Sequence, residues 1–329
     1  MPPGYGARRG NGGTMDIRQL KYFVTVAAHE NFSKAAQQLF IAQPALSRRI
    51  RMLEDELGVR LFERHLRGAT LTPEGRRLLD RAQYLLRSFD QLKSDVHDTQ
   101  GPPSGPVIIG MTPNYVTVIG AALTVAIKQR FPDAQPHIVQ AFSPAMHDML
   151  RDNAVDIALL SGATPAPPPA HMLAVEPLFE DRLCLVGRAG DPLLARSEIP
   201  VRQLRGLPLI LTGVSRAGIR NEIEALAARQ RVPLRIEAEV GAFALAAQLV
   251  RLGMGYTVYL PSSVALEAGL AAVPIAGLWL QRSLAWPVSR PLSRVASEVL
   301  PMVRELILAQ VEQGQWQGAR AMGRRRPRG

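Results

Sequence analysis

The chain has 329 residues, of which 47% are hydrophobic and 20% charged, enough for the cores of one small and one medium domain, which excludes a wholly disordered protein. No stretch approaches about 18 uncharged apolar residues, and the Gly-, Pro- and Arg-rich residues 1–14 contain no apolar segment. We therefore expect no membrane span, no secretory signal and a soluble, cytoplasmic protein. The single cysteine, Cys184, excludes an intramolecular disulfide and a thiolate metal cluster.

The net charge of +11 is concentrated at the two ends of the chain. Residues 1–100 have a net charge of +5, residues 101–319 of +1 and residues 320–329 of +5. A basic N-terminal region beside a near-neutral remainder indicates that one end meets an anionic polymer. We interpret residues 313–329 as a basic flexible tail, with non-specific phosphate binding as the alternative.

The N-terminal region predicts a helix-turn-helix. Residues 16–29 carry apolar side chains at spacings of three and four, so this helix packs inward. Ser33 is a candidate N-cap for a short helix over residues 34–39. Gln43 and Pro44 open a third helix, because proline is tolerated in the first helical turn. Two helices joined by a short turn, the second rich in arginine, are typical of DNA-binding proteins.

The third helix has an apolar side and a polar side. At 100° per residue, the apolar side contains Leu46, Ile50, Leu53 and Leu57, and the opposite side contains Pro44, Ser47, Arg48 and Arg51. A hydroxyl, guanidinium groups and an apolar ring suit base edges, phosphates and thymine methyl groups. Gln43 has the amide that pairs with an adenine edge, and Arg49, nearer the buried side, suits a phosphate. A solvated amphipathic helix is the alternative.

A short wing and a long helix follow. Residues 58–71 read as a β-type wing with Arg64 and Arg67 near its turn, and Thr72 and Pro73 begin a helix that runs to about residue 99. Its apolar residues form a heptad seam: Leu78, Ala82, Leu85, Phe89, Leu92 and Val96. A helix of about 26 residues is roughly 39 Å long. We expect a partner helix in a homodimer, which would present two recognition helices to a two-fold symmetric site; a helix lying on its own chain is the alternative.

These segments resemble a known family. The sequences MDIRQLKYF (15–23), NFSKAAQQL (31–39), AQPALSRRI (42–50), LEDELGVRLFER (53–64) and LTPEG (71–75) are similar to the N-terminal signature of LysR-type transcriptional regulators. The resemblance implies that Gln43, Pro44, Ser47 and Arg48 contact bases or nearby phosphates and that Arg67 approaches the minor groove. Our candidate DNA-binding set adds Ser33, Arg49, Arg51 and Arg64. Members of the family usually begin where Met15 stands, so residues 1–14 are either a mis-assigned start or a flexible extension.

A looser resemblance continues to about residue 310. Residues 101–106 are a linker by composition. Beyond them, expected strands at 107–111, 138–142, 155–160, 172–188, 208–212, 235–240 and 255–260 alternate with expected helices at 118–130, 146–153, 218–231 and 243–252, with a proline-rich loop at 164–169. Such alternation indicates parallel βαβ units in two lobes. The resemblance implies a periplasmic-binding-protein-like fold in which the chain crosses near Glu180 and returns near Ser262.

The expected architecture is α/β with an all-α-type winged helix-turn-helix head. Its parts are a flexible extension (1–14), a winged helix-turn-helix DNA-binding domain (15–72), a linker and dimerisation helix (73–100), an effector-binding domain (106–312) and the tail (313–329). Within the effector-binding domain, lobe I covers about 106–179 and 263–312, and lobe II about 180–262.

Ligands of open α/β sheets bind beyond the carboxyl ends of strands, beside helix N-termini. The residues at these ends are hydroxyl-rich and uncharged, and we take them as candidate effector-binding residues: Thr112, Asn114, Tyr115, Ser143, Ser161, Thr212, Ser215 and Phe243. They suit a small organic acid or a polar metabolite, with Arg216 or Arg220 as a source of charge. Ordinary helix capping is the alternative for each residue taken alone.

Other motifs lack the required context. Residues 253–255 precede a strand and lack a third glycine, the six histidines have no metal-ligand spacing, and Cys184 reads as strand core. We expect no catalytic residue, cofactor or metal. The segments DIALL (156–160), EPLFE (176–180), LPLIL (207–211) and GMGYTV (253–258) are similar to the nitrogen-assimilation-regulator branch of the family.

We therefore expect a sequence-specific transcriptional regulator that binds double-stranded promoter DNA and a small-molecule effector. The resemblance implies a homodimer that assembles to a homotetramer, and RNA polymerase as a further partner. The alternative is a solute-binding protein or an enzyme on the same two-lobed scaffold, with the head as a non-specific DNA anchor.

Overall fold

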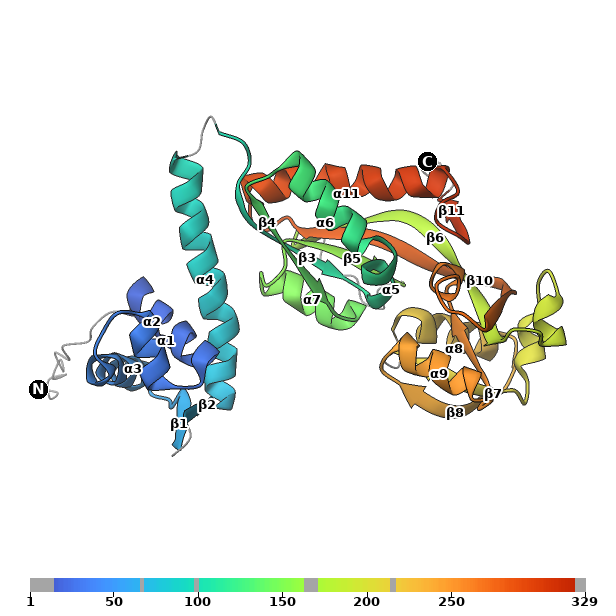
Figure 1. Ribbon diagram of the computed structural model, residues 1–329, viewed down its shortest axis with the longest axis horizontal. Helices are drawn as coiled ribbons and strands as arrows, with labels where there is room; N and C mark the ends of the chain where they lie inside the picture. The colour runs from blue at the N-terminus through green and yellow to red at the C-terminus, as the bar shows by residue number, and fades with distance from the viewer. Residues whose placement is uncertain (1–14, 66–67, 98–100, 163–170, 214–216, 323–329) are drawn as a thin grey trace, which may run out of the picture. The chain divides into compact units, whose positions relative to one another are not determined.

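The computed structural model describes residues 15–65, 68–97, 101–162, 171–213 and 217–322 (Figure 1). It separates into two compact units, residues 1–99 and residues 100–329. We call the first unit the head and the second the C-terminal domain, and describe each by itself. No helix in the described ranges has the length and apolar character needed to cross a bilayer.

The head is a winged helix-turn-helix. It contains α1 (Ile17–His29), α2 (Phe32–Gln38), α3 (Gln43–Leu57), the hairpin of β1 (Phe62–His65) and β2 (Gly68–Leu71), and α4 (Pro73–His97). Its core is formed by Phe23 and Val26 of α1, Ile50 and Leu53 of α3 and Phe62 of the hairpin, with smaller residues of α2 between them. The expected order of helices and wing is confirmed.

Asn31, and not Ser33, caps α2. The side chain of Asn31 accepts hydrogen bonds from the backbone N–H groups of Ser33 and Lys34, at 2.9 and 3.0 Å. The helix therefore begins at Phe32, earlier than expected, and Ser33 lies inside its first turn. Both residues are good N-caps, and the extended backbone of Asn31 decides between them.

The end of α3 differs from the helical-wheel expectation. Leu57 is exposed, whereas Glu54 is buried and accepts hydrogen bonds from the backbone N–H groups of Leu61 and Phe62, at 2.8 and 3.3 Å. The chain leaves the helix at Gly58, whose φ of 67° is left-handed. Because the chain turns at Gly58, Phe62 of the hairpin, and not Leu57, completes the core at this end. The carboxylate of Glu54 accepts hydrogen bonds from the first backbone N–H groups of that segment.

The long helix α4 begins where the sequence predicts it. The hydroxyl of Thr72 accepts a hydrogen bond from the Gly75 N–H at 2.9 Å and donates to the carbonyl of Arg60 at 2.7 Å. Gly75 is required, because a Cβ atom there would lie 2.2 Å from the carbonyl oxygen of Leu61.

The first residues of the heptad seam pack against other helices of the same chain. Ala82 is fully buried and Leu78 half-buried against the head, so that for this part of α4 the helix does lie on its own chain. Leu85 is 43% exposed, and Phe89 is half-buried. The side chains of Leu92 and Val96 lie outside the described residues. Leu85 is therefore the first of these heptad positions that the head leaves exposed.

The described strands of the C-terminal domain form one nine-stranded sheet in the order β4-β3-β5-β10-β6-β9-β7-β8, with β11 added to β6. In the first lobe, β3 (Gly105–Met111), β4 (Ala134–Gln140) and β5 (Ile157–Ser161) are parallel. Helices α6 (Ala121–Arg130) and α11 (Arg294–Glu312) cover one face of these strands and α7 (Ser143–Arg151) covers the other (Figure 1).

The second lobe repeats this arrangement. Its parallel strands are β7 (Pro208–Thr212), β8 (Arg235–Val240) and β9 (Tyr256–Tyr259), packed with α8 (Gly218–Arg229) and α9 (Phe243–Arg251). The long antiparallel strands β6 (Leu173–Arg188) and β10 (Leu270–Pro287) run through both lobes. Short 3-10 turns, Pro192–Ala195 and Val201–Leu204, and the helix α10 (Pro261–Val264) complete the lobe. The expected two α/β lobes are confirmed.

Several element boundaries differ from the expected ones because of proline. The helix expected at 118–130 begins at Pro113 as α5 (Pro113–Tyr115) and passes through a π-helical turn (Val116–Gly120) into α6. The helix expected at 146–153 likewise begins at Ser143, with proline in its first turn. The strand expected at 138–142 starts at Ala134, since Pro136 is tolerated in β4, the edge strand of the sheet. The strand expected from residue 107 begins at Gly105, within the expected linker.

The expected return to the first lobe near Ser262 is wrong. Val264, Val273, Ile275 and Leu278 all pack in the core of the second lobe. The chain crosses back within β10, where Arg282 pairs with Ser161 of the first lobe. The two lobes have similar apolar cores, and the sequence of residues 263–280 does not indicate which of the two cores its apolar side chains enter.

The described part of the expected flexible tail is folded. Trp316 is 2% exposed and packs against the rings of Tyr115 and Phe179, with centroid distances of 5.6 and 5.0 Å. Strand β11 (Ala319–Ala321) pairs with β6, and Arg320 forms an ion pair with Glu180 at 2.7 Å. The many arginines of this segment favoured the interpretation as a flexible tail, but its tryptophan, Trp316, fixes it to the first lobe. Residues 323–329 lie outside the described residues.

Trp316→Ala removes the indole that fills the core of the first lobe, and we expect the free energy of unfolding to fall by about 3–5 kcal/mol. Urea denaturation measures this change. Gln317→Ala, at the exposed neighbouring position, is the matched control and should stay within about 0.5 kcal/mol of wild type. An unchanged midpoint for Trp316→Ala would restore the flexible-tail interpretation.

Candidate functional site

The exposed face of α3 carries most of the predicted DNA-binding residues. Gln43, Pro44, Arg48, Arg49 and Arg51 are exposed or partly exposed. Three guanidinium groups and one amide thus lie within nine residues of one helix, without a carboxylate between them. This arrangement suits phosphates and the edges of bases in a major groove.

Ser47 does not lie on the free face, contrary to the helical-wheel prediction. Its side chain is 4% exposed, and its hydroxyl accepts a hydrogen bond from the Gln43 amide at 2.9 Å. The wheel gives the direction of a side chain but not how far the neighbouring helices cover it. Ser47 therefore orients Gln43 in this structure.

The wing contributes a further cation. The guanidinium of Arg64 lies over the ring of Phe32, 4.5 Å from the centroid, which ties the wing to the first turn of α2. Partial burial is the main cause that lowers the pKa of Arg64, and Glu54 opposes it. Ser33 lies in the same turn of α2. Arg67 lies outside the described residues.

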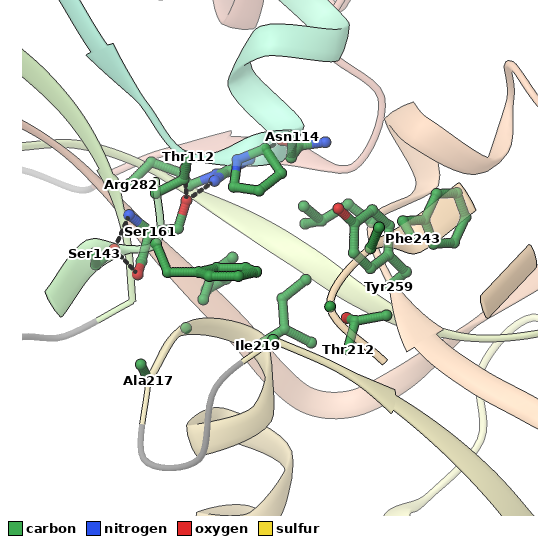
Figure 2. A pocket seen from close by; sticks show the side chains of 18 residues that line it. Thr112, Asn114, Ser143, Ser161, Thr212, Ala217, Ile219, Phe243, Tyr259 and Arg282 are labelled. Atoms are coloured by element: carbon green, nitrogen blue, oxygen red, sulfur yellow. Dashed lines mark hydrogen bonds between the residues drawn. The ribbon is translucent and has the colours of Figure 1, made fainter. Parts of the chain in front are cut away.

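The C-terminal domain has a pocket between its lobes, enclosing about 550 Å³ that includes space open to solvent (Figure 2). It lies at the carboxyl ends of β3, β5, β7 and β9 and at the first turns of α7, α8 and α9. Of the predicted effector-binding residues, six line it: Thr112, Asn114, Ser143, Ser161, Thr212 and Phe243. Tyr115 packs in the first lobe's core and is not part of the wall, and Ser215 lies outside the described residues.

Arg282, on β10, is a lining residue that the sequence did not indicate. Its Nε and Nη2 atoms donate to Oδ2 of Asp181 at 3.3 and 3.2 Å, and its other hydrogen bonds go to the Ser161 hydroxyl and the Asn114 carbonyl oxygen. Both charged side chains are fully buried. The pocket therefore has a charged lining residue, but it is Arg282 and not one of the two arginines, Arg216 and Arg220, that we considered as a source of charge. No strand was expected around Arg282, and its neighbours Gln281 and Ser283 are polar, so no pattern in the sequence singled it out.

Asp181 is held from a second side by the C-terminal segment. The indole Nε1 of Trp316 donates to its Oδ2 at 3.0 Å, while Oδ1 has no partner among the described residues. Burial raises the pKa of this carboxyl above its ordinary value, and Arg282 opposes that effect most strongly. The ring of Tyr115 lies 4.4 Å from the guanidinium. Arginine, aspartate and two aromatic rings thus form one buried cluster behind the pocket.

The polar side chains on the first-lobe wall bond to one another. The hydroxyls of Thr112 and Ser161 lie 2.5 Å apart, and the Ser143 hydroxyl donates to the Ser161 carbonyl at 2.9 Å (Figure 2). The amide of Asn114 donates to the Ser263 hydroxyl at 2.7 Å. This wall is therefore a preorganised hydrogen-bond network.

The second-lobe wall is mainly apolar. The ring of Tyr259 stacks on that of Phe243 with centroids 3.9 Å apart and an angle of 7°. Burial raises the pKa of Tyr259 to about 12, so this hydroxyl is neutral near pH 7. Tyr259, like Arg282, was not predicted from the sequence.

Arg220, expected as a source of charge, and Cys184, expected as strand core, both lie outside the pocket wall. Arg220 forms ion pairs with Glu224 and Glu239 at 2.8 and 2.7 Å and does not line the pocket, so it adds no charge there. Arg216 lies outside the described residues. Cys184 is buried in β6, and burial raises the pKa of its thiol to about 12. In the described part of the chain, no three His, Cys, Asp or Glu side chains are grouped as metal ligands.

A winged helix-turn-helix head joined to a two-lobed domain with a central pocket defines a ligand-responsive DNA-binding protein. The model for "Bacterial regulatory helix-turn-helix protein, lysR family" matches residues 17–76, and the model for "LysR substrate binding domain" matches residues 100–307. The chain belongs to the LysR family of transcriptional regulators.

Its relatives are regulators along their whole length. The chain is 30% identical over 309 residues to the transcriptional regulator BbuR of Bordetella bronchiseptica, covering 92% of this chain and 94% of BbuR. It is 28% identical over 311 residues to the nitrogen assimilation regulatory protein Nac of Escherichia coli, covering 92% and 99%. Since these relatives are regulators and not enzymes, the solute-binding or enzymatic alternative is set aside.

Solved structures of the family share the fold. A full-length OxyR variant from Pseudomonas aeruginosa matches with a TM-score of 0.69 at 23% identity, covering 96% of this chain and 100% of that one. CbnR, a LysR family regulator, matches with a TM-score of 0.68 at 21% identity, covering 88% and 99%. The expected combination of winged head and two-lobed C-terminal domain is confirmed.

Arg282→Met leaves the Asp181 carboxylate buried without its cation, and we expect a loss of about 3–5 kcal/mol in the free energy of unfolding. The double variant Arg282→Met with Asp181→Leu removes both charges and should lose much less than the two single variants together. Chemical denaturation of the four proteins gives the coupling energy. Additive losses would show that the two groups do not stabilise each other.

Proposed function

We propose that the chain binds a promoter sequence as a homodimer and that a small molecule in the inter-lobe pocket changes this binding. The observation that carries the proposal is the pocket itself, because residues of both lobes line it. An effector that contacts both lobes has different affinities for different arrangements of them. It therefore shifts their populations, and this is how binding at one site alters another.

We assign direct base contacts to Gln43, Pro44 and Arg48, which lie near the start of α3. Arg49 and Arg51 suit phosphates on either side, as do Ser33 at the start of α2 and Arg64 of the wing, and Arg67 is assigned to the minor groove. Ser47 acts through Gln43, whose amide it holds. Phosphate contacts place the head, and base contacts provide the specificity.

We assign the dimer seam to Leu85, Phe89, Leu92 and Val96, because Leu78 and Ala82 are used by the head. Assembly to a homotetramer and a contact with RNA polymerase complete the proposal. A regulator of promoter DNA acts where the chromosome is, so we place the protein in the cytoplasm.

Selection of genomic fragments by the purified full-length protein, at near-physiological salt, tests the proposal. An interrupted palindrome among the enriched fragments is the expected result of a dimer. The affinity for such a site should fall steeply with salt, because phosphate neutralisation releases counterions. Enrichment no greater than that of a variant lacking residues 15–72, together with a flat salt dependence, would overturn it.

Arg48→Ala should weaken binding to the selected site by roughly 1–3 kcal/mol and relax the preference at one base position. Fluorescence anisotropy with cognate and scrambled duplexes measures both effects. Arg77→Ala is the control, because it removes the same charge from an exposed position on α4 that pairs with Glu74. If the loss were equal on both duplexes, Arg48 would be a phosphate contact.

Leu85→Asp combined with Phe89→Asp places two charges on the proposed seam and should convert the dimer to monomers. Sedimentation velocity gives the mass in solution. Arg76→Asp puts a negative charge on an exposed position outside the seam and should leave the mass unchanged. If the double variant kept the wild-type mass, the assignment of the seam would be wrong.

A further inference from the structure

Two hydroxyls on the second-lobe wall of the pocket lack the partners that the first-lobe hydroxyls have. Thr212 is 7% exposed and Tyr259 is 6% exposed, and both line the pocket. Neither hydroxyl forms a hydrogen bond within the described part of the chain. Both hydroxyl oxygens are open to the pocket, unlike the enclosed hydroxyl of Tyr115, so a ligand atom can take the place of water as their partner.

The two hydroxyl-bearing residues are neighbours in the sheet. Parallel strands β7 and β9 pair in a register that matches Leu209 with Tyr256 and Ile210 with Thr257. The same register continued by two residues sets Thr212 beside Tyr259, at the carboxyl ends of both strands. Figure 2 shows the two on the same side of the pocket, across from Ser143 and Ser161.

The first turns of three helices add unpaired donors at the same pocket. The N-cap residues of α7, α8 and α9 are Phe142, Ala217 and Ala242, whose side chains have no oxygen to accept a hydrogen bond. All three line the pocket. Backbone N–H groups in these first turns remain for the oxygens of a ligand, and the positive ends of the helix dipoles favour an anion.

The other residues that line the pocket limit the charge of this anion and favour an apolar body. Arg282 is the charged member among the described lining residues, and Asp181 already neutralises it. The rest of the wall is largely apolar: Ile219, Phe243, Leu260 and Leu280, with the alanines at the helix starts. One negative charge finds donors here, whereas a second charge would lose its hydration against apolar side chains.

We propose that Thr212 and Tyr259 determine the specificity of the pocket and that its effector is a small monocarboxylate with an apolar body. The carboxylate accepts hydrogen bonds from the two hydroxyls and from the first turns of the helices, and the body lies against Phe243, Leu260 and Leu280. This inference rests on the proposed function of the pocket as the effector site.

The test is isothermal titration of the full-length protein with benzoate, phenylacetate and 3-methylbutanoate, each compared with its amide, and with the dianion phthalate. We expect at least one monocarboxylate to bind at least tenfold more tightly than its amide and than phthalate. Tyr259→Phe and Thr212→Val should each weaken that binding by about tenfold or more, because each removes a hydrogen bond to a charged group.

Tyr115→Phe is the matched control. It also removes a fully buried tyrosine hydroxyl that has no partner among the described residues, but Tyr115 does not line the pocket. Its affinity for the monocarboxylate should equal that of wild type. DNA affinity and thermal unfolding of every variant verify that the chain is folded, and Tyr259→Phe retains the ring that stacks on Phe243.

Ala242→Trp, which fills the pocket from an exposed position, separates the possible failures. If it abolishes binding while Tyr259→Phe and Thr212→Val bind as wild type, the hydroxyl pair does not read the effector and the proposal is wrong. The class of effector is wrong if no monocarboxylate binds, or if amides or phthalate bind equally well. If Ala242→Trp also binds as wild type, the effector site lies elsewhere and the proposed function of the pocket fails with it.

Discussion

The buried ion pair of Asp181 and Arg282 is the constraint on which the C-terminal domain depends. Moving two charges out of water is costly and is offset only when every donor and acceptor finds good geometry. Here the partners come from separate parts of the chain: β6 and β10 supply the charges, the segments at the ends of β3 and β5 supply Asn114 and Ser161, and the C-terminal segment supplies Trp316. The pair therefore joins both crossing strands, the wall of the first lobe and the end of the chain.

The ion pair also sets the chemistry of the pocket. Because Asp181 neutralises Arg282, the guanidinium organises the first-lobe wall without offering a free charge to a ligand. The hydroxyls and amide of that wall are occupied by one another, so recognition falls to the second lobe and to the helix starts. The first-lobe wall is thus held by its own hydrogen bonds, whereas the second-lobe wall has hydroxyls that can donate to a ligand. Such a division suits a ligand that binds both walls and so favours one arrangement of the lobes.

The helices of the head, in contrast, are fixed by interactions between residues that are close together in the sequence. Each helix begins with a local cap, supplied by Asp16, Asn31 and Thr72, or with a proline in its first turn, as at Pro44. Residues 43–51 of α3 contain three arginines and no carboxylate. The structure therefore leaves a basic, preorganised surface on the head, while α4 changes from core helix to exposed seam between Ala82 and Leu85.

The sequence by itself determined the elements of the head, the alternation of strands and helices in the C-terminal domain, and six residues of the pocket wall. These follow from caps, helical periodicity and the ends of strands, which are properties of neighbouring residues. Only the tertiary structure decided that Ser47 is covered, that Trp316 anchors the expected tail and that the return crossing lies within β10. It alone paired Asp181 with Arg282, 101 residues apart in the chain. It alone distinguished the unpaired hydroxyl of Tyr259 at the pocket from that of Tyr115 in the core, because burial and pairing depend on distant segments that local sequence does not specify.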